Sequence, residues 1–151
     1  MPLITKTSTI SKESLKCYSC SRERRKLLFE GAKESGCSKI AFGHHKDDAV
    51  ETLLMNLLHK AEFSSMLAKV PMERYGITII RPLIYVEEKE IVQFAKMHGF
   101  WRITCKCPVG QTSQRRKTAD ILNYLEKDFV NAKENLFQAG ELFGSKKALT
   151  P

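Results

Sequence analysis

The polar residues at positions 44–48 (His-His-Lys-Asp-Asp) form the densest group of side chains in the sequence that could bind a ligand or carry out chemistry. They follow a short apolar run at 39–42, interpreted as a buried strand, and precede an amphipathic stretch with apolar residues at helical spacing. In an open α/β sheet, ligands bind where strands end and helices begin. We therefore expect a binding site at this turn, with Asp47 as a carboxylate near magnesium or a nucleotide.

The other residues of this turn have competing structural interpretations. Asp48 and Glu51 have the D-x-x-E spacing of a capping box, which predicts that Asp48 is the N-cap of the following helix. His44 could be a site residue or a core histidine with satisfied hydrogen bonds. His45 and Lys46 could simply belong to a solvated loop.

Four of the five cysteines form two close pairs, Cys17-x-x-Cys20 and Cys105-x-Cys107. Each pair lies shortly before or at the start of a predicted helix, and such turns can converge at one edge of a sheet. Thiolates held together bind zinc or an iron–sulfur cluster. The spacing favours a metal or a cluster, with a thioredoxin-like redox pair and incidental cysteines as alternatives. The remaining cysteine, Cys37, is interpreted as a small buried apolar residue.

Basic residues follow both cysteine pairs. The first group is Arg22, Arg24, Arg25 and Lys26, and the second is Arg115, Arg116 and Lys117. A cation in the first turn of a helix opposes the helix dipole at a cost of up to about 1 kcal/mol. Two such groups indicate an external anion that offsets this cost, such as a nucleic-acid backbone or a nucleotide phosphate. The alternative is a solvated helix face on which Glu23 is the local partner.

The composition is that of an ordinary globular protein. The chain has 151 residues, of which 42% are hydrophobic and 28% charged, and this length fits one domain. A net charge of +8 favours a polyanionic partner such as RNA. No apolar run approaches the roughly 20 residues that span a bilayer, and no signal peptide is recognisable. We therefore expect a cytoplasmic protein with no membrane partner, whose cysteines serve metal or redox chemistry.

Hydrophobic periodicity and turn residues predict alternating strands and helices. The predicted strands are 3–10, 39–42, 77–81 and a short one at 100–104, with an irregular connection at 61–75. The predicted helices are 17–35, 48–59, 87–98, 113–127 and 130–143. Their expected core positions include Leu27, Leu28, Val50, Leu53, Leu54, Leu57, Leu58, Ile91, Phe94, Ile121 and Leu122. The alternation predicts an α/β fold with a parallel sheet and flanking helices, in a single domain spanning 1–151.

Several motifs in a fixed order give the sequence a family resemblance. They are Cys-x-x-Cys-Ser-Arg-x-Arg-Arg at 17–25, Lys-Ile-Ala-x-Gly-His-His-x-Asp-Asp-x-x-Glu-Thr-Leu-x-x-Asn at 39–56, Ile-Ile-Arg-Pro-Leu-x-Tyr-Val at 79–86, and a late cysteine followed by Gln114-Arg115. Together they resemble the PP-loop ATP pyrophosphatases, within them the tRNA 2-thiocytidine synthetase-like subgroup. The resemblance covers nearly the whole chain.

The resemblance implies a Rossmann-like, adenine nucleotide alpha hydrolase-like fold and the ATP- and Mg²⁺-dependent thiolation of a tRNA base, cytidine to 2-thiocytidine. It implies a [4Fe–4S] cluster held by three cysteines with one iron left open. When the family's cluster ligands are carried over to this sequence, they are Cys17, Cys20 and Cys107. Cys105 is then a nearby non-ligand, a sulfur relay or the alternative third ligand. The implied nucleotide-site residues are Gly43, His44, Asp47 and Asp48, with Asp47 as the catalytic carboxylate. The implied tRNA contacts are Arg24, Arg25, Arg115 and Arg116.

One departure from the family pattern is large. The signature loop Ser-Gly-Gly-x-Asp-Ser does not occur in the sequence, and we expect it to precede residue 1 together with its strand and helix. The strand at 39–42 would then lie next to the absent central strand. From this we expect a chain that is inactive alone, that dimerises through this edge, or that requires a separate chain for the loop. The other expected partners are tRNA and a sulfur donor such as a cysteine desulfurase.

Two other functions remain open from the sequence. One is a lysidine synthetase-like PP-loop enzyme, which would modify tRNA without needing the cysteine pairs. The other is a zinc-stabilised RNA-binding module without catalysis. The identity of the bound metal separates these alternatives.

Overall fold

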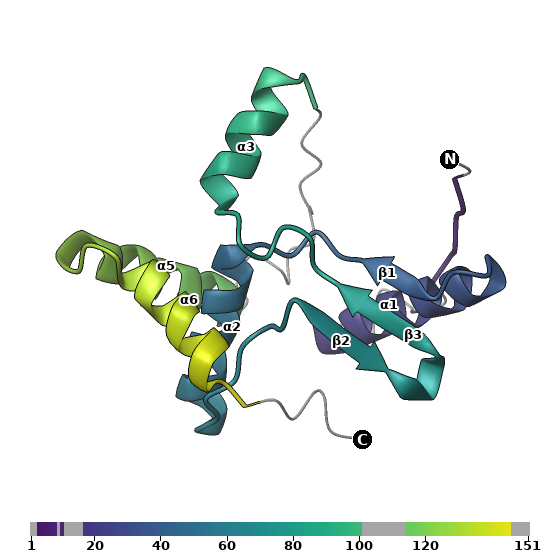
Figure 1. Cartoon of the computed structure of the whole chain (residues 1–151), viewed down its shortest axis with the longest axis horizontal. Helices are drawn as coiled ribbons and strands as arrows, with labels where there is room; N and C mark the ends of the chain where they lie inside the picture. The colour runs from purple at the N-terminus through teal and green to yellow at the C-terminus, as the bar shows by residue number, and fades with distance from the viewer. Residues whose placement is uncertain (1–2, 9, 11–16, 101–113, 146–151) are drawn as a thin grey trace.

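The computed structural model describes residues 3–8, 10, 17–100 and 114–145 (Figure 1). Its elements in chain order are α1 (Cys17–Glu34), β1 (Lys39–Ala41), α2 (Lys46–Lys60), β2 (Lys69–Met72), the 3₁₀ helix η2 (Glu73–Tyr75), β3 (Ile77–Ile80), α3 (Glu88–Met97), α5 (Gln114–Asp128) and α6 (Ala132–Phe143). The predicted helices therefore form, each with ends shifted by no more than two residues.

The three strands form one sheet in the order β1-β3-β2. β1 pairs in parallel with β3, with Ile40 opposite Ile79, as the alternation of strands and helices predicts. β2 runs antiparallel to β3, with Val70 opposite Ile79. The sequence interpretation was wrong here, because it assigned 61–75 to an irregular connection. A four-residue strand that contains Pro71 gives little local signal, and proline is tolerated on such an edge strand.

Two apolar clusters hold the molecule together. In one, Phe29 of α1 packs against Val70, Ile77 and Ile79 on one face of the sheet. In the other, the first half of α2 packs against α5 and α6; its buried members are Ala49, Val50, Leu54, Ile84, Leu122 and Phe137. In Figure 1, α1 lies along the sheet, whereas α5 and α6 lie beside α2 at the opposite end of the molecule.

A glycine sets how closely α6 approaches the segment that follows α2. Gly140 of α6 is buried, and a Cβ on it would lie 3.1 Å from the Cβ of Ser65 and 3.5 Å from Leu53. The distance to Leu53 is an ordinary contact, but a larger residue at this position would require Ser65 or α6 to shift. The contact explains why a glycine is accommodated inside a helix despite its lower helix propensity.

Two expectations near the N-terminus are wrong. Residues 3–8 form no strand, and Leu3 is 93% exposed. Their alternating pattern finds no neighbouring strand, and Lys6 instead pairs with Glu34 at the end of α1. Cys37 is exposed rather than buried. It follows Gly36, whose φ of +68° ends α1, and its N–H donates to the Ala32 carbonyl in this turn.

The sequence also overestimated how much of each helix face is covered. Exposed residues that were expected in the core are Leu28, Leu57, Leu58, Phe94 and Ile121. A helical apolar stripe predicts a buried face but not how far its neighbours extend along it. α3 shows this most clearly, because it has no buried residue and projects away from the body of the molecule (Figure 1). β1 is likewise not fully buried: Lys39 and Ala41 are exposed.

Some predictions lie outside the described residues. These are the strand at 101–104 and the pair Cys105 and Cys107; Phe100, which is described, is not in a strand. Within the described part, none of the helices has the length and apolar character needed to cross a membrane.

The first prediction tests the α2–α5–α6 core. Leu53 is fully buried and Leu58, on the same helix, is 61% exposed. Leu53→Ala should lower the free energy of unfolding by about 2–5 kcal/mol, because it leaves a cavity. Leu58→Ala should change it by less than about 0.5 kcal/mol. Urea denaturation of both variants checks this, and equal losses would contradict the packing described.

Candidate functional site

The candidate site lies where β1 ends and α2 begins. The Phe42 N–H donates to the Ile80 carbonyl and continues the β1–β3 ladder. This pairing places Gly43 and His44 beside Arg81, which directly follows β3. The Lys46 N–H donates to the Val86 carbonyl at 2.9 Å. The turn thus occupies the carboxyl edge of the two parallel strands, as the sequence predicts.

His44 is held as a neutral imidazole. Its Nδ1 accepts a hydrogen bond from Arg81 Nε at 3.3 Å, and Arg81 also donates to the Leu67 carbonyl. Burial lowers the pKa of His44 below its ordinary value; the charge of Asp48 opposes this, and the charges of Arg81 and Arg115 reinforce it. With Nδ1 as the acceptor, Nε2 carries the proton. His44 can therefore donate a hydrogen bond without bringing a positive charge.

The capping box of α2 lies three residues earlier than the sequence suggested. His45 is the N-cap, with extended backbone angles, and its N–H donates to an Asp48 carboxylate oxygen at 3.1 Å. Asp48 is therefore the N3 residue of the box rather than the N-cap, and Glu51 is not its partner. Asp48 was expected to be the N-cap because aspartate is a favoured N-cap residue and histidine is not.

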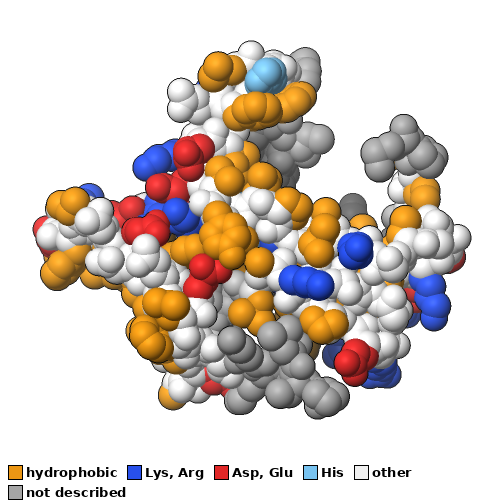
Figure 2. All heavy atoms as spheres, in the orientation of Figure 1, with side chains coloured by type: hydrophobic (Ala, Val, Ile, Leu, Met, Phe, Trp, Pro, Cys, Tyr) orange, Lys and Arg blue, Asp and Glu red, His pale blue; other side chains and the backbone are white. Residues whose placement is uncertain are grey.

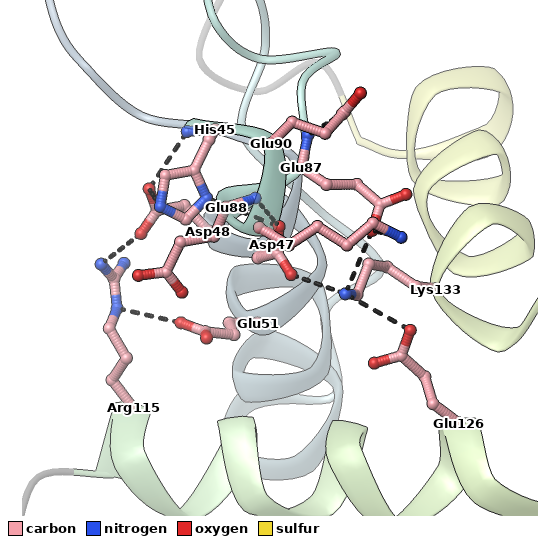
Figure 3. Close-up of polar contacts among 11 residues, drawn as sticks. His45, Asp47, Asp48, Glu51, Glu87, Glu88, Glu90, Arg115, Glu126 and Lys133 are labelled. Atoms are coloured by element: carbon pink, nitrogen blue, oxygen red, sulfur yellow. Dashed lines mark hydrogen bonds and ion pairs between the residues drawn. The ribbon is translucent and has the colours of Figure 1, made fainter. Parts of the chain in front are cut away.

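Arg115 of α5 neutralises one side of the α2 start. Its Nη1 lies 2.9 Å from Asp48 Oδ1, and its Nε lies 3.7 Å from Glu51 Oε2. Figure 3 shows Arg115 reaching from α5 toward both carboxylates. Arg115, which was expected to contact tRNA, thus has carboxylate partners within the protein. The His45 ring lies between the two aspartates, with Nδ1 3.7 Å from Asp47 and Nε2 3.4 Å from Asp48.

Lys133 of α6 neutralises the other side. Its Nζ lies 2.7 Å from Asp47 Oδ1, 3.3 Å from Glu126 and 3.6 Å from Glu87, as Figure 3 shows. Asp47 Oδ2 accepts the Glu88 N–H at 2.7 Å. Burial alone would raise the pKa of Asp47, but the hydrogen bonds from Lys133 and Glu88 outweigh it and lower the pKa below its ordinary value. Lys133 is a site residue that the sequence interpretation missed.

A third ion pair reinforces the same junction, since Lys46 Nζ lies 2.8 Å from Glu134 of α6. Figure 2 shows acidic and basic side chains gathered between α3 and the α5–α6 pair. The local pattern of the motif could not identify Lys133 or Glu134, because each is more than 80 residues from its partner. The cluster joins α2, α3, α5 and α6.

The placement of these residues bears on magnesium and nucleotide binding. Both oxygens of Asp47 are engaged by protein donors, so a magnesium ion at Oδ1 would have to displace Lys133. As placed, Asp47 does not fit a magnesium ligand. Among the residues that the structure describes, no group of three or more His, Cys, Asp or Glu is arranged to hold a metal ion. Gly43 and His44 lie at the carboxyl end of β1, beside Arg81.

The cysteine and arginine predictions are only partly within the described residues. Cys17 is the first residue of α1, and Cys20 lies three positions later with a partly exposed thiol. Cys107 lies outside the described part, so the three-cysteine site stays a prediction. Arg24 and Arg25 are exposed on α1, and Arg116 is exposed on α5. Arg25 of α1 lines the same groove as Arg81, whereas Arg115 of α5 pairs with Asp48 and Glu51.

Comparison with known proteins was made against families, curated sequences and solved structures. Residues 1–103 match the family model described as the PP-loop domain. The chain is 41% identical over 125 residues to the tRNA-cytidine(32) 2-sulfurtransferase of Geobacter sulfurreducens, covering 82% of this chain and 49% of that protein. It is 37% identical over 142 residues to the enzyme of the same name from Syntrophotalea carbinolica, covering 89% and 55%. The chain thus spans about half the length of the curated relatives it matches.

A solved structure has the same fold. It is the U34-tRNA thiolase NcsA from Methanococcus maripaludis with its [4Fe-4S] cluster. The TM-score is 0.68 at 24% identity, over 87% of this chain and 45% of that one. The likeness confirms the α/β fold predicted from the sequence.

The second prediction concerns Glu51, which faces the crowded carboxylates. Burial and the charges of Asp48, Asp47 and Glu88, opposed by Arg115, raise its pKa from 4.5 to about 7. The folded pKa lies above the unfolded one, so ionisation of Glu51 removes stability as the pH rises from about 4.5 to 7.

Glu51→Gln abolishes this ionisation, so the variant should gain stability relative to the parent as the pH rises. One pKa unit corresponds to about 1.4 kcal/mol, and the solvent that still reaches the Glu51 side chain, which is 15% exposed, reduces the effect. We therefore expect the difference in unfolding free energy to grow by about 1–2 kcal/mol between pH 5 and pH 8. Asp128→Asn, on an exposed position, is the control. If the difference in unfolding free energy between Glu51→Gln and the parent did not change with pH, ionisation of Glu51 would not destabilise the folded protein.

Proposed function

Because this chain belongs to the PP-loop domain family, we propose that it acts in the ATP-dependent thiolation of a tRNA base, with cytidine converted to 2-thiocytidine. The observation that carries the proposal is the cysteine pair Cys17 and Cys20 in the first turn of α1, in a chain whose relatives are named tRNA-cytidine(32) 2-sulfurtransferases. Thiolates are the ligands that iron–sulfur clusters require, and base thiolation requires a group that delivers sulfur.

In this proposal Cys17, Cys20 and Cys107 hold a [4Fe–4S] cluster, with Cys105 as the alternative third ligand. When bound, the cluster would have one iron without a cysteine ligand and would supply the sulfur-transfer chemistry. The two described cysteines suit this chemistry because they lie within one helical turn, and α1 carries no acidic residue in that turn. The sulfur would come from a donor such as a cysteine desulfurase.

The nucleotide contacts belong to the turn after β1. Gly43 lies there without a side chain, and neutral His44 donates from Nε2 to an oxygen of the nucleotide. Asp47 and Asp48 act by holding this turn through Lys133 and Arg115. Mg²⁺ would arrive with the ATP phosphates, which is its usual mode of binding in such sites. Direct ligation by Asp47 would require Lys133 to withdraw.

The remaining elements of the proposal concern RNA and assembly. The exposed cations Arg24, Arg25 and Arg116 contact the tRNA backbone, whereas Arg115 contributes only if it leaves Asp48. The protein acts in the cytoplasm, where tRNA is found. A second protein chain, either another copy of this one or a different one, is a further partner in this proposal.

Two alternatives predict different products. A lysidine synthetase-like enzyme would form lysidine in tRNA, and a zinc-stabilised RNA-binding module would form no modified nucleoside. The cysteine pair favours thiolation over the first. The neutral histidine and glycine at the strand edge favour catalysis over the second, because a purely RNA-binding module needs no such turn.

The third prediction is the experiment that separates these functions. Nucleoside analysis of tRNA by mass spectrometry should show that deleting the gene removes 2-thiocytidine. The parent gene and a Cys37→Ser variant should restore it, because Cys37 lies in the turn after α1 and away from the cysteine pair. Cys17→Ser, Cys20→Ser and Cys107→Ser should not restore it.

The same variants give a chemical readout. Protein purified without oxygen should contain iron and acid-labile sulfide in the parent and in Cys37→Ser, and lose both in the other three variants. Loss of lysidine on gene deletion, or zinc without iron in the purified protein, would refute the proposed function.

A further inference from the structure

A groove of about 650 Å³ lies between α1 and the β2–β3 half of the sheet. Its floor is the apolar contact of Phe29 with Val70 and Ile79. It lies apart from the ion pairs at the start of α2, although Arg81 borders both. The volume is within the range of about 300–1,000 Å³ that is usual for small-molecule and cofactor sites.

Positive charge dominates the wall of this groove. The charged residues that line it are the cations Arg22, Arg25, Lys26 and Arg81 and the carboxylate Glu23. Four cations and one carboxylate leave a net charge of +3. The ion pair of Lys26 with Glu30 is long, at 3.8 Å between Nζ and Oε1, and both side chains are exposed. No ion pair is found for Arg22 among the described residues. α1 has no acidic residue in its first turn, so among the described residues Glu23 and Glu30 are the carboxylates found beside these cations.

The groove also offers apolar and aromatic surface. The rings of Phe29 and Tyr75 are in contact, with centroids 4.9 Å apart, and Tyr75 is 38% exposed. Met66 and Met72 line the same space. A simple inorganic anion would gain nothing from such a floor. A ligand that carries both a negative charge and a flat apolar ring would use the cations and the floor together.

We propose that this groove binds one unstacked nucleotide of an RNA. Its phosphate lies against Arg22 and Lys26, which are one helical turn apart, and its base lies on the Met72–Tyr75 side. Unstacked bases in RNA loops are commonly recognised by stacking on aromatic side chains. Ser19, next to Cys20, lines one end of the groove, so the nucleotide is held near the cysteine pair. The inference rests on the proposed function for the identity of the RNA.

The fourth prediction tests this with the 151-residue chain and fluorescently labelled, unmodified tRNA, followed by fluorescence anisotropy at several salt concentrations. Arg22→Ala combined with Lys26→Ala should weaken binding by about tenfold or more and lower the salt slope by about one, because one phosphate is no longer neutralised. The matched control, Lys33→Ala combined with Lys127→Ala, removes the same charge from exposed positions outside the groove. It should weaken binding by less than about threefold.

A second variant reports on the base rather than the phosphate. Tyr75→Ala should weaken binding by about fivefold or more without changing the salt slope, because it removes stacking surface and no charge. Both groove variants alter exposed side chains, and circular dichroism confirms that they are folded.

The outcomes separate the two proposals. If the parent binds tRNA and the two double variants weaken binding equally, or Tyr75→Ala has no effect, the groove assignment is wrong while the proposed function stands. If the parent binds no tRNA at any salt concentration, the groove assignment fails, whereas the proposed function is decided by the nucleoside analysis above. If a fully paired RNA duplex displaced tRNA as readily as single-stranded RNA does, the proposal that the groove binds an unstacked nucleotide would be wrong.

Discussion

The pairing of carboxylates at the start of α2 with cations from α5 and α6 is the constraint on which the arrangement of this protein depends. Asp47, Asp48 and Glu51 are all largely withdrawn from water. Carboxylates in such a place are costly unless cations and N–H donors compensate them. Lys133 and Arg115 provide this compensation from helices that follow α2 by more than 50 residues. The position of the α5–α6 pair is thereby coupled to the turn that carries Gly43 and His44.

This coupling changes the meaning of the motif at 44–48. Its residue types alone suggested carboxylates that wait for a metal or a nucleotide. The structure instead gives Asp47 and Asp48 protein partners, and leaves His44 as a neutral donor held by Arg81. The motif therefore links the carboxyl end of β1 to α5 and α6 through Asp48–Arg115 and Asp47–Lys133.

The features that the sequence predicts correctly are those set by local chemistry or by several motifs in order. The helices, the parallel β1–β3 pair and the Gly36 turn follow from periodicity and from glycine at a left-handed position. The family resemblance is confirmed by the match of residues 1–103.

The antiparallel β2 was not predicted, because its strand conformation depends on pairing with β3 and its own sequence gives little strand signal. Lys133 escaped because its role exists only after α6 has packed against α2. The exposure of Phe94 was not predicted, because helical periodicity does not reveal whether another element covers the apolar stripe.

A double-mutant cycle on Asp47 and Lys133 tests this account most directly. Asp47→Asn, Lys133→Met and the combined variant would be compared with the parent by urea denaturation at pH 7. The account predicts that the two single losses overlap, with a coupling free energy of about 1–3 kcal/mol, because each residue loses its main partner when the other is replaced. Losses that add within about 0.5 kcal/mol would show that the two residues act independently and that α6 is not held to α2 by this pair.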